Sequence, residues 1–223
     1  MSPIPSALFP AQSAIAPSDV ASAAQPVMRR IDRIYHLAEA ENLPSILERG
    51  LMSTERLLDE TRIGDPERTG LLRGHRPSSV RLSGGALIRD QRPMPPTALA
   101  PALEDGFEPS DWYALLNGFV FFWADRDRML RHLSACHGRP QALLTFDAAA
   151  LFDRFAADAF VSPINSGNAR RKAARRGRNT LVAYTTWLQE GWPTGQRTRP
   201  PAEILVRGIV PTQAPFLIDI AKT

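Results

Sequence analysis

Apolar and polar residues alternate along this chain in short blocks with the spacing of strands and short helices. The segment 34–52, IYHLAEAENLPSILERGLM, begins as an extended apolar run and continues with helical spacing. Asn42 is a favourable N-cap for that helix, Pro44 falls in its first turn, and Gly50 stands where helices commonly end in a left-handed residue. A helix of about two turns is marginal in water by itself. We therefore expect a strand, a short helix docked on a core, and a sharp stop.

The segment 119–123, FVFFW, is a continuous apolar and aromatic run, which predicts a central strand covered on both faces. Further strands are expected at 79–82, 86–88, 141–146, 180–184, 202–206 and 216–221. Helices are expected at 53–59, 112–117, 126–136 and 148–155, with Ser110, Asp125 and Asp147 as N-caps. Residues 61–81 are basic without a clear period, and residues 93–109 contain five prolines, so both segments are expected to be irregular.

Length and composition favour one domain. The chain has 223 residues and 43% hydrophobic content, enough for one sizeable core but not for a second full domain. Residues 1–28 are rich in Ala, Pro and Ser, and their prolines prevent a long helix, so we expect a flexible leader. This leader lacks the basic start of a secretory signal, while export by another machinery stays open. A single domain is expected over residues 29–223.

Charge and cysteine content limit the partners and the compartment. The formal net charge of +4 and the sequence pI of about 9.8 favour an anionic partner. The single cysteine, Cys136, excludes an internal disulfide, and the four histidines show no zinc-site spacing. We therefore expect a reducing, cytoplasmic compartment and no structural metal. No run approaches the roughly 18 apolar residues of a membrane span.

Three polar residues adjoin apolar strands. His36 lies inside one, where a histidine is more often structural than functional, and both readings stay open. Glu203 begins another, and a carboxylate there is costly unless it faces a cleft or a partner. Arg89 directly follows the strand 86–88 and is well placed to face a cleft, although a salt-bridged loop would account for it equally well.

The most polar stretch of the chain lies between residues 162 and 180. It contains six positive residues and no acid between positions 170 and 178: Arg170, Arg171, Lys172, Arg175, Arg176 and Arg178. Asn165-Ser-Gly-Asn168 places turn amides and side-chain donors beside them. A phosphate or nucleic-acid site is one interpretation, and a disordered basic loop is an equal alternative.

Three motifs, in this order, resemble the DarT-like branch of the ADP-ribosyltransferases: Tyr35-His36 through Gly50-Leu51, the aromatic strand 119–123 with the helix after it, and Ala202-Glu203-Ile-Leu-Val206. The resemblance implies an α+β fold in which a split mixed β-sheet and short helices surround an NAD cleft. A sister group of uncharacterised bacterial proteins is more fully similar to this chain, including Arg89-Asp-Gln91 and Ser162-Pro-Ile-Asn-Ser-Gly167.

The resemblance also implies roles. Glu203 would stabilise an oxocarbenium-like transition state, and His36 would contact a ribose. NAD would be the co-substrate, held by His36, Tyr35, Gly50, Leu51, Phe122, Trp123 and Asn165. Arg89, with Arg76 and Arg81 behind it, would supply a cation near the pyrophosphate or the acceptor.

Several alternatives stay open. The acceptor of ADP-ribose is expected to be DNA or RNA slightly ahead of protein, because of the basic segment 170–178. A non-catalytic nucleotide or nucleic-acid binding module, or an NAD glycohydrolase, would fit the same motifs. The presence of an antitoxin or immunity partner is also open.

Overall fold

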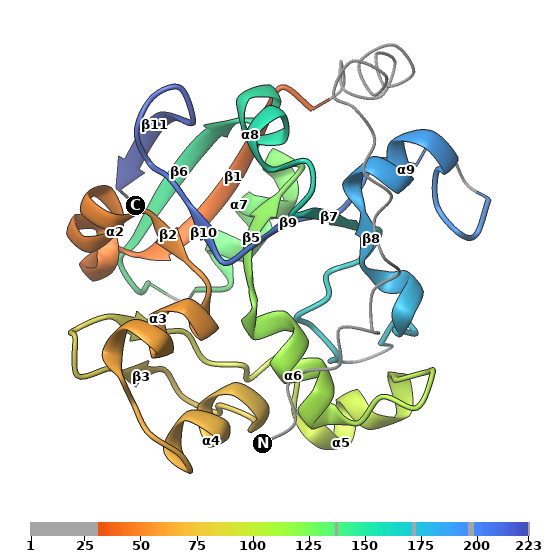
Figure 1. Cartoon of the computed structure of the whole chain (residues 1–223), viewed down its shortest axis with the longest axis horizontal. Helices are drawn as coiled ribbons and strands as arrows, with labels where there is room; N and C mark the ends of the chain where they lie inside the picture. Colours follow the sequence, from red (N-terminus) through yellow and green to blue (C-terminus); the bar gives the residue numbers. More distant parts are fainter. Residues whose placement is uncertain (1–30, 137, 171–172, 196–198, 223) are drawn as a thin grey trace.

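The computed structural model of the chain describes residues 31–136, 138–170, 173–195 and 199–222. The expected leader 1–28, and Arg171 and Lys172 of the basic segment, lie outside these residues. The centre of the fold is a seven-stranded sheet in the order β11-β6-β1-β5-β9-β7-β8 (Figure 1). Its strands are β1 (Arg33–Glu39), β5 (Phe119–Trp123), β6 (Gln141–Asp147), β7 (Ala159–Ser162), β8 (Val182–Ala183), β9 (Glu203–Arg207) and β11 (Leu217–Lys222).

The sheet is split between β1 and β5. These strands share one residue pair, Tyr35 with Trp123, whereas β1 pairs with β6 along its whole length. Every neighbouring pair of strands in the sheet is antiparallel. The expectation of a mixed sheet is therefore wrong. The relative direction of two strands depends on the path of the chain between them, and the residues of a single strand do not predict that path.

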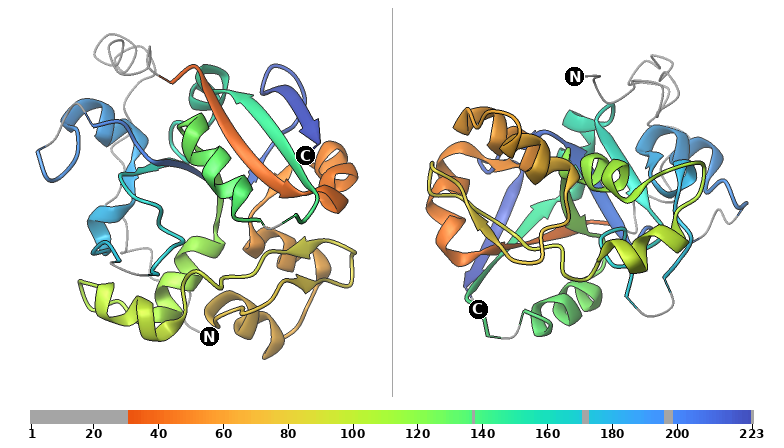
Figure 2. Two further views of the ribbon diagram at one scale, coloured as in Figure 1. Left: turned by 180° about the vertical axis from the view of Figure 1, so that it is seen from behind. Right: turned by 90° about the horizontal axis from the view of Figure 1, so that it is seen from below.

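Helices cover both faces of the sheet (Figures 1 and 2). One core joins the sheet to α8 and α9 through Leu151, Phe152 and Trp187, and a second joins it to α6 through Trp112 and Leu116. The α-helices are α2 (Leu43–Arg49), α3 (Thr54–Thr61), α4 (Glu67–Arg73), α5 (Pro96–Leu99), α6 (Pro109–Asn117), α7 (Arg126–Ser134), α8 (Ala148–Phe155) and α9 (Tyr184–Glu190). Short 3-10 helices lie at Ala40–Asn42, Ala100–Ala102 and Arg178–Thr180.

A small lobe with its own apolar cluster lies beside the sheet. It contains α3, α4 and the two-stranded sheet of β3 (Val80–Arg81) and β4 (Leu87–Ile88), packed around Leu58, Leu72, Leu82 and Ile88. The helices α4 and α5 correct the expectation that segments 61–81 and 93–109 are irregular. Both are short and depend on tertiary packing, which buries Leu72 of α4 and Leu99 of α5.

The opening segment forms the expected strand, short helix and stop, but the side chain of Asn42 does not cap the helix. It hydrogen-bonds the backbone of Leu87 instead. The strand β1 leads into α2, and Gly50 ends the helix at φ 89°. A Cβ atom at this position would lie 2.8 Å from the carbonyl oxygen of Val210, so both backbone conformation and space require glycine. The stop brings β2 (Leu51–Met52) against β10 (Ile209–Val210), next to the split in the sheet. Among the described residues, no helix is both long and apolar enough to cross a membrane.

Candidate functional site

A cleft of about 580 Å³ lies between the split sheet and the small lobe. His36 and Glu203, which are far apart in the sequence, both line it. The cleft also brings together most of the residues that the sequence singled out: Gly50, Leu51, Arg89, Phe122, Trp123, Asn165 and Arg170. Tyr35 is outside the lining, although it stands opposite Trp123 in the sheet.

Glu203 is a buried carboxylate at the start of β9. Its Oε2 accepts two hydrogen bonds from Ser166, one from the backbone N–H at 3.0 Å and one from the hydroxyl at 2.7 Å. The other oxygen, Oε1, makes no hydrogen bond to any residue that the structure describes. Burial raises the pKa of Glu203 from 4.5 to about 7, while the two Ser166 bonds and the guanidinium of Arg176 oppose that rise. One carboxylate oxygen is thus fixed and the other is available to a ligand hydroxyl.

A second layer fixes Ser166 itself. Its carbonyl accepts the Trp112 indole N–H at 3.3 Å and an Arg176 Nη1–H at 2.9 Å. Arg176 is 1% exposed and also donates to the carbonyls of Asn168 and Ala174. It does not line the cleft. The expected nucleic-acid role is therefore wrong for Arg176, because its guanidinium is buried and hydrogen-bonded to the backbone of the 162–177 loop.

His36 of β1 lies at the split in the sheet and forms a hydrogen bond across it to β5. Its Nδ1 lies 2.8 Å from the carbonyl oxygen of Phe121, so Nδ1 carries the proton and Nε2 is a hydrogen-bond acceptor. Burial lowers the pKa of His36 from 6.5 to about 4, the hydrogen bond to Phe121 opposes this shift, and the positive charge of Arg89 adds to it. The imidazole is therefore neutral at pH 7.

Arg89 is held in a network at the end of β1 and the start of β6. Its Nε donates to Glu39 at 3.1 Å, its Nη2 donates to Gln141, and its Nη1 lies 3.0 Å from Nε2 of His132. Gln141 completes the ring by donating to Glu39 at 2.7 Å. Arg89 does line the cleft and forms an ion pair with Glu39, which Arg139 also contacts at 3.4 Å.

The two aromatic candidates differ in environment. Phe122 is 1% exposed and packs edge-on against Phe146, with ring centroids 5.2 Å apart, so its ring belongs mainly to the core. Trp123 is partly exposed and lies 5.5 Å from the His132 ring. Of the two, Trp123 offers the more accessible ring face to a planar ligand.

The described part of the basic segment divides by environment. Arg170 is exposed and lines the cleft. Arg175 forms an exposed ion pair with Glu104 at 2.8 Å, and the backbone N–H of Arg178 donates to Asp105. Only Arg170 among these residues adds its charge to the cleft.

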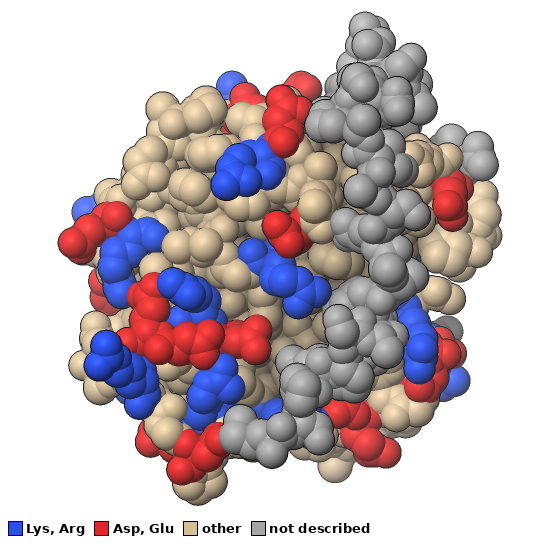
Figure 3. Space-filling model, in the orientation of Figure 1, with Lys and Arg blue, Asp and Glu red and all other residues tan. Residues whose placement is uncertain are grey.

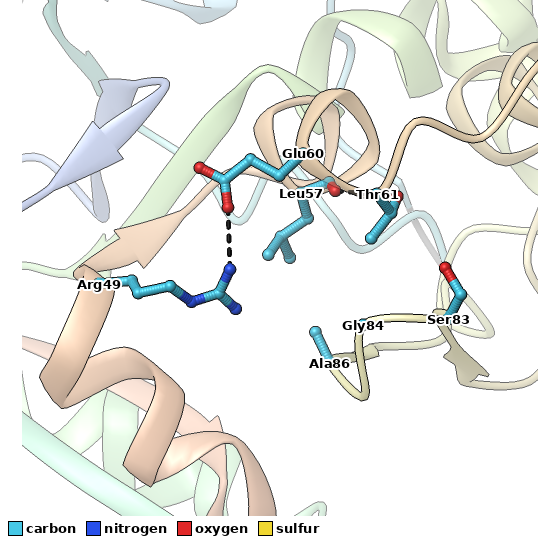
Figure 4. A pocket seen from close by; sticks show the side chains of 7 residues that line it. All are labelled: Arg49, Leu57, Glu60, Thr61, Ser83, Gly84 and Ala86. Atoms are coloured by element: carbon cyan, nitrogen blue, oxygen red, sulfur yellow. Dashed lines mark hydrogen bonds and ion pairs between the residues drawn. The ribbon is translucent and has the colours of Figure 1, made fainter.

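A smaller hollow of about 310 Å³ adjoins the cleft and shares Arg49, Leu57 and Ala86 with it (Figure 4). Glu60 pairs with Arg49 there at 2.9 Å. Acidic and basic side chains are interspersed over this region, at the lower left of Figure 3. The charges of Arg49 and Glu60 in this hollow are therefore already paired with each other.

Sequence reasoning missed Ser166, Glu39, Gln141 and His132 as parts of the site. Ser166 could have been found, because it stands within the Asn165–Asn168 turn already noted. Glu39 and Gln141 become neighbours only through the register that pairs β1 with β6. His132 lies on α7, which packs on β1, and this contact brings its ring to the cleft.

Fold and cleft together define an α+β protein in which a split antiparallel sheet holds a large cleft with a buried carboxylate. The chain belongs to a family of unknown function, DUF7002, whose model matches residues 32–217. No curated protein matches it. Thermosipho africanus DarTG in complex with ADP-ribose is similar at 15% identity and a TM-score of 0.43, over 84% of this chain and 43% of that one. The chain thus spans less than half of that protein's length, and a likeness this low assigns no activity.

Proposed function

We propose that this protein is an NAD-dependent ADP-ribosyltransferase in which Glu203 is the catalytic residue. The observation that carries the proposal is the carboxylate itself, which is buried in the same cleft as His36, fixed through one oxygen by Ser166 and left with a free Oε1. Structural carboxylates with no such role are ordinarily either exposed or fully paired.

In this reaction the bond between nicotinamide and the anomeric carbon of its ribose breaks. Nicotinamide leaves with the bonding electron pair, and the sugar develops the positive charge of an oxocarbenium ion. Oε1 of Glu203 would accept a hydrogen bond from the 2′-hydroxyl of that ribose, and this interaction strengthens as the charge grows. An acceptor nucleophile then bonds to the anomeric carbon and loses its proton.

The size of the cleft supports binding of a dinucleotide. A volume of about 580 Å³ lies within the range of small-molecule sites, which is about 300–1,000 Å³. The neutral His36 ring would contact ribose through Nε2, and the Trp123 ring would stack on nicotinamide. Gly50 and Leu51 would offer backbone groups at the floor, and Asn165 would offer its amide.

The acceptor proposed is DNA or RNA. Arg170 supports this choice, because it is exposed at the cleft and forms no ion pair with any residue in the described ranges. A phosphate of an entering strand would bind there, whereas the nearby Arg175 is already paired.

The decisive experiment is incubation of the full chain with labelled NAD and a panel of DNA, RNA and protein. We expect nicotinamide release, transfer of label to nucleic acid, and loss of both in Glu203→Ala. Glu190→Ala, which changes an exposed carboxylate on α9, is the control and should keep full release. Unchanged release in a folded Glu203→Ala protein would refute the proposal. Release without transfer would identify a glycohydrolase, and NAD binding without release would identify a binding module.

A further inference from the structure

Most of the arginines that line the cleft have a carboxylate partner. Arg89 pairs with Glu39, and Arg92 pairs with Asp90. Arg139 contacts both of these acids, and Arg49 pairs with Glu60. Within the described ranges, the two cleft arginines that form no ion pair are Arg76 and Arg170. Arg170 is exposed, so water solvates its charge.

Arg76 is different because it is 7% exposed. Its guanidinium binds only neutral oxygens: Nη1 donates to the Leu71 carbonyl at 2.6 Å, Nη2 to Asn117 Oδ1 at 2.9 Å, and Nε to the Arg89 carbonyl at 3.3 Å. A guanidinium carries five N–H groups. One N–H on each of Nη1 and Nη2 therefore has no partner among the residues that the structure describes.

Asp90 forms no ion pair with Arg76. Asp90 acts on Arg76 electrostatically, but its carboxylate already forms ion pairs with Arg92 at 3.2 Å and Arg139 at 3.3 Å. Burial lowers the pKa of Arg76 from 12.5 to about 10, so the side chain stays charged at pH 7. A buried charge without a counter-charge is costly, and the cost falls when an anion binds beside it.

We infer that Arg76 forms an anion site in the wall of the cleft, and that its ligand is a phosphate or pyrophosphate group. The two unused N–H groups suit the paired oxygens of such a group, which guanidinium binds in a bidentate manner. This assignment reverses the order expected from the sequence, which placed Arg89 first. The identification of the anion as the pyrophosphate of NAD rests on the proposed function. Binding of a free anion at Arg76 does not, because it requires no turnover of NAD.

The test uses inorganic pyrophosphate and the full chain, with binding measured by titration calorimetry at constant ionic strength. Asn117→Asp replaces the amide oxygen next to Arg76 with a carboxylate of nearly the same shape, so it supplies the missing counter-charge from within the protein. Asn117→Leu is the matched control, since it also loses the amide donor to the Leu72 carbonyl but adds no charge. Arg81, which the sequence placed behind Arg89 as a candidate cation, does not line the cleft and is an exposed arginine paired with Glu41. Arg81→Gln therefore controls for loss of general positive charge.

We expect wild type and Arg81→Gln to bind pyrophosphate equally, and Asn117→Asp to bind at least tenfold more weakly than Asn117→Leu. Equal affinities in the two Asn117 variants, or no binding to wild type, would overturn the inference. If both Asn117 variants fail to fold, a wild-type crystal soaked in pyrophosphate decides: density at Arg76 Nη1 and Nη2 supports the site, and an adventitious ion only, on the surface, refutes it. Pyrophosphate binding without nicotinamide release would leave this site standing while the proposed function fails.

Discussion

Replacing Glu203 with Gln should stabilise the protein at alkaline pH while it stops the proposed reaction. The substitution keeps the shape of the side chain and an oxygen for the two Ser166 donors, but it removes the charge. In the native state the pKa of Glu203 is about 7, whereas the ordinary value is 4.5. The folded protein therefore binds a proton between these values that the unfolded chain has already lost. The free energy of unfolding of the wild type must fall as pH rises across that range.

The size of the effect follows from the two pKa values. Each tenfold change in proton affinity corresponds to about 1.4 kcal/mol, so the interval between 4.5 and about 7 amounts to on the order of 3 kcal/mol. Glu203→Gln has no carboxyl group at this position, so its free energy of unfolding does not fall for this reason as the pH rises. The difference in unfolding free energy between Glu203→Gln and wild type should thus grow by that amount between pH 4 and pH 8.

Urea denaturation at several pH values measures this difference, and a nicotinamide-release assay on the same samples measures activity. We expect at least a hundredfold loss of release in Glu203→Gln, which is typical when one transition-state contact is removed. Glu190→Gln, at an exposed position, should show neither effect. A difference in stability that stays constant from pH 4 to pH 8 would refute the assignment of a buried, proton-binding carboxylate.

Three further predictions concern neighbours of this carboxylate. Ser166→Ala removes a hydroxyl donor to a charged group, a bond that contributes about 1.5–3 kcal/mol, so the acid limb of a pH–activity profile should move upward by about one pH unit or more; an unmoved limb would contradict it. Arg176→Ala should lower the free energy of unfolding by about 3 kcal/mol, because it removes a buried guanidinium that donates hydrogen bonds to the carbonyls of Ser166, Asn168 and Ala174 and so holds their loop, while Arg175→Ala, at an exposed ion pair, should cost less than about 1 kcal/mol in the same denaturation experiment. Phe122→Ala should cost about 4 kcal/mol as a core truncation, and a cost near zero would return this ring to the ligand-binding surface.

Local residue patterns predicted much of the framework. The strands at 119–123 and 141–146, the N-caps Asp125 and Asp147, and the stop at Gly50 all rest on interactions within a few residues. The expected N-cap Ser110 is wrong, because α6 begins earlier, at Pro109, with Glu108 as its N-cap. These features follow from side-chain spacing and backbone conformation alone. The proline-rich and basic segments were harder, since their short helices form only when a neighbour buries an apolar side chain.

What the sequence determined by itself was the identity of the chemical groups: a histidine within an apolar strand, a glutamate at the start of another, and an excess of arginine. Tertiary structure decided which of these groups share a cleft and in what state of charge. The split in the sheet places Glu203 and His36 together, the 162–177 loop fixes one carboxylate oxygen through Ser166, and burial sets both pKa values. It also separates Arg176, which holds a loop, from Arg76, which faces the cleft without a counter-charge. Charge state and ion pairing depend on burial and on residues far apart in the chain, and for that reason only the folded molecule specifies them.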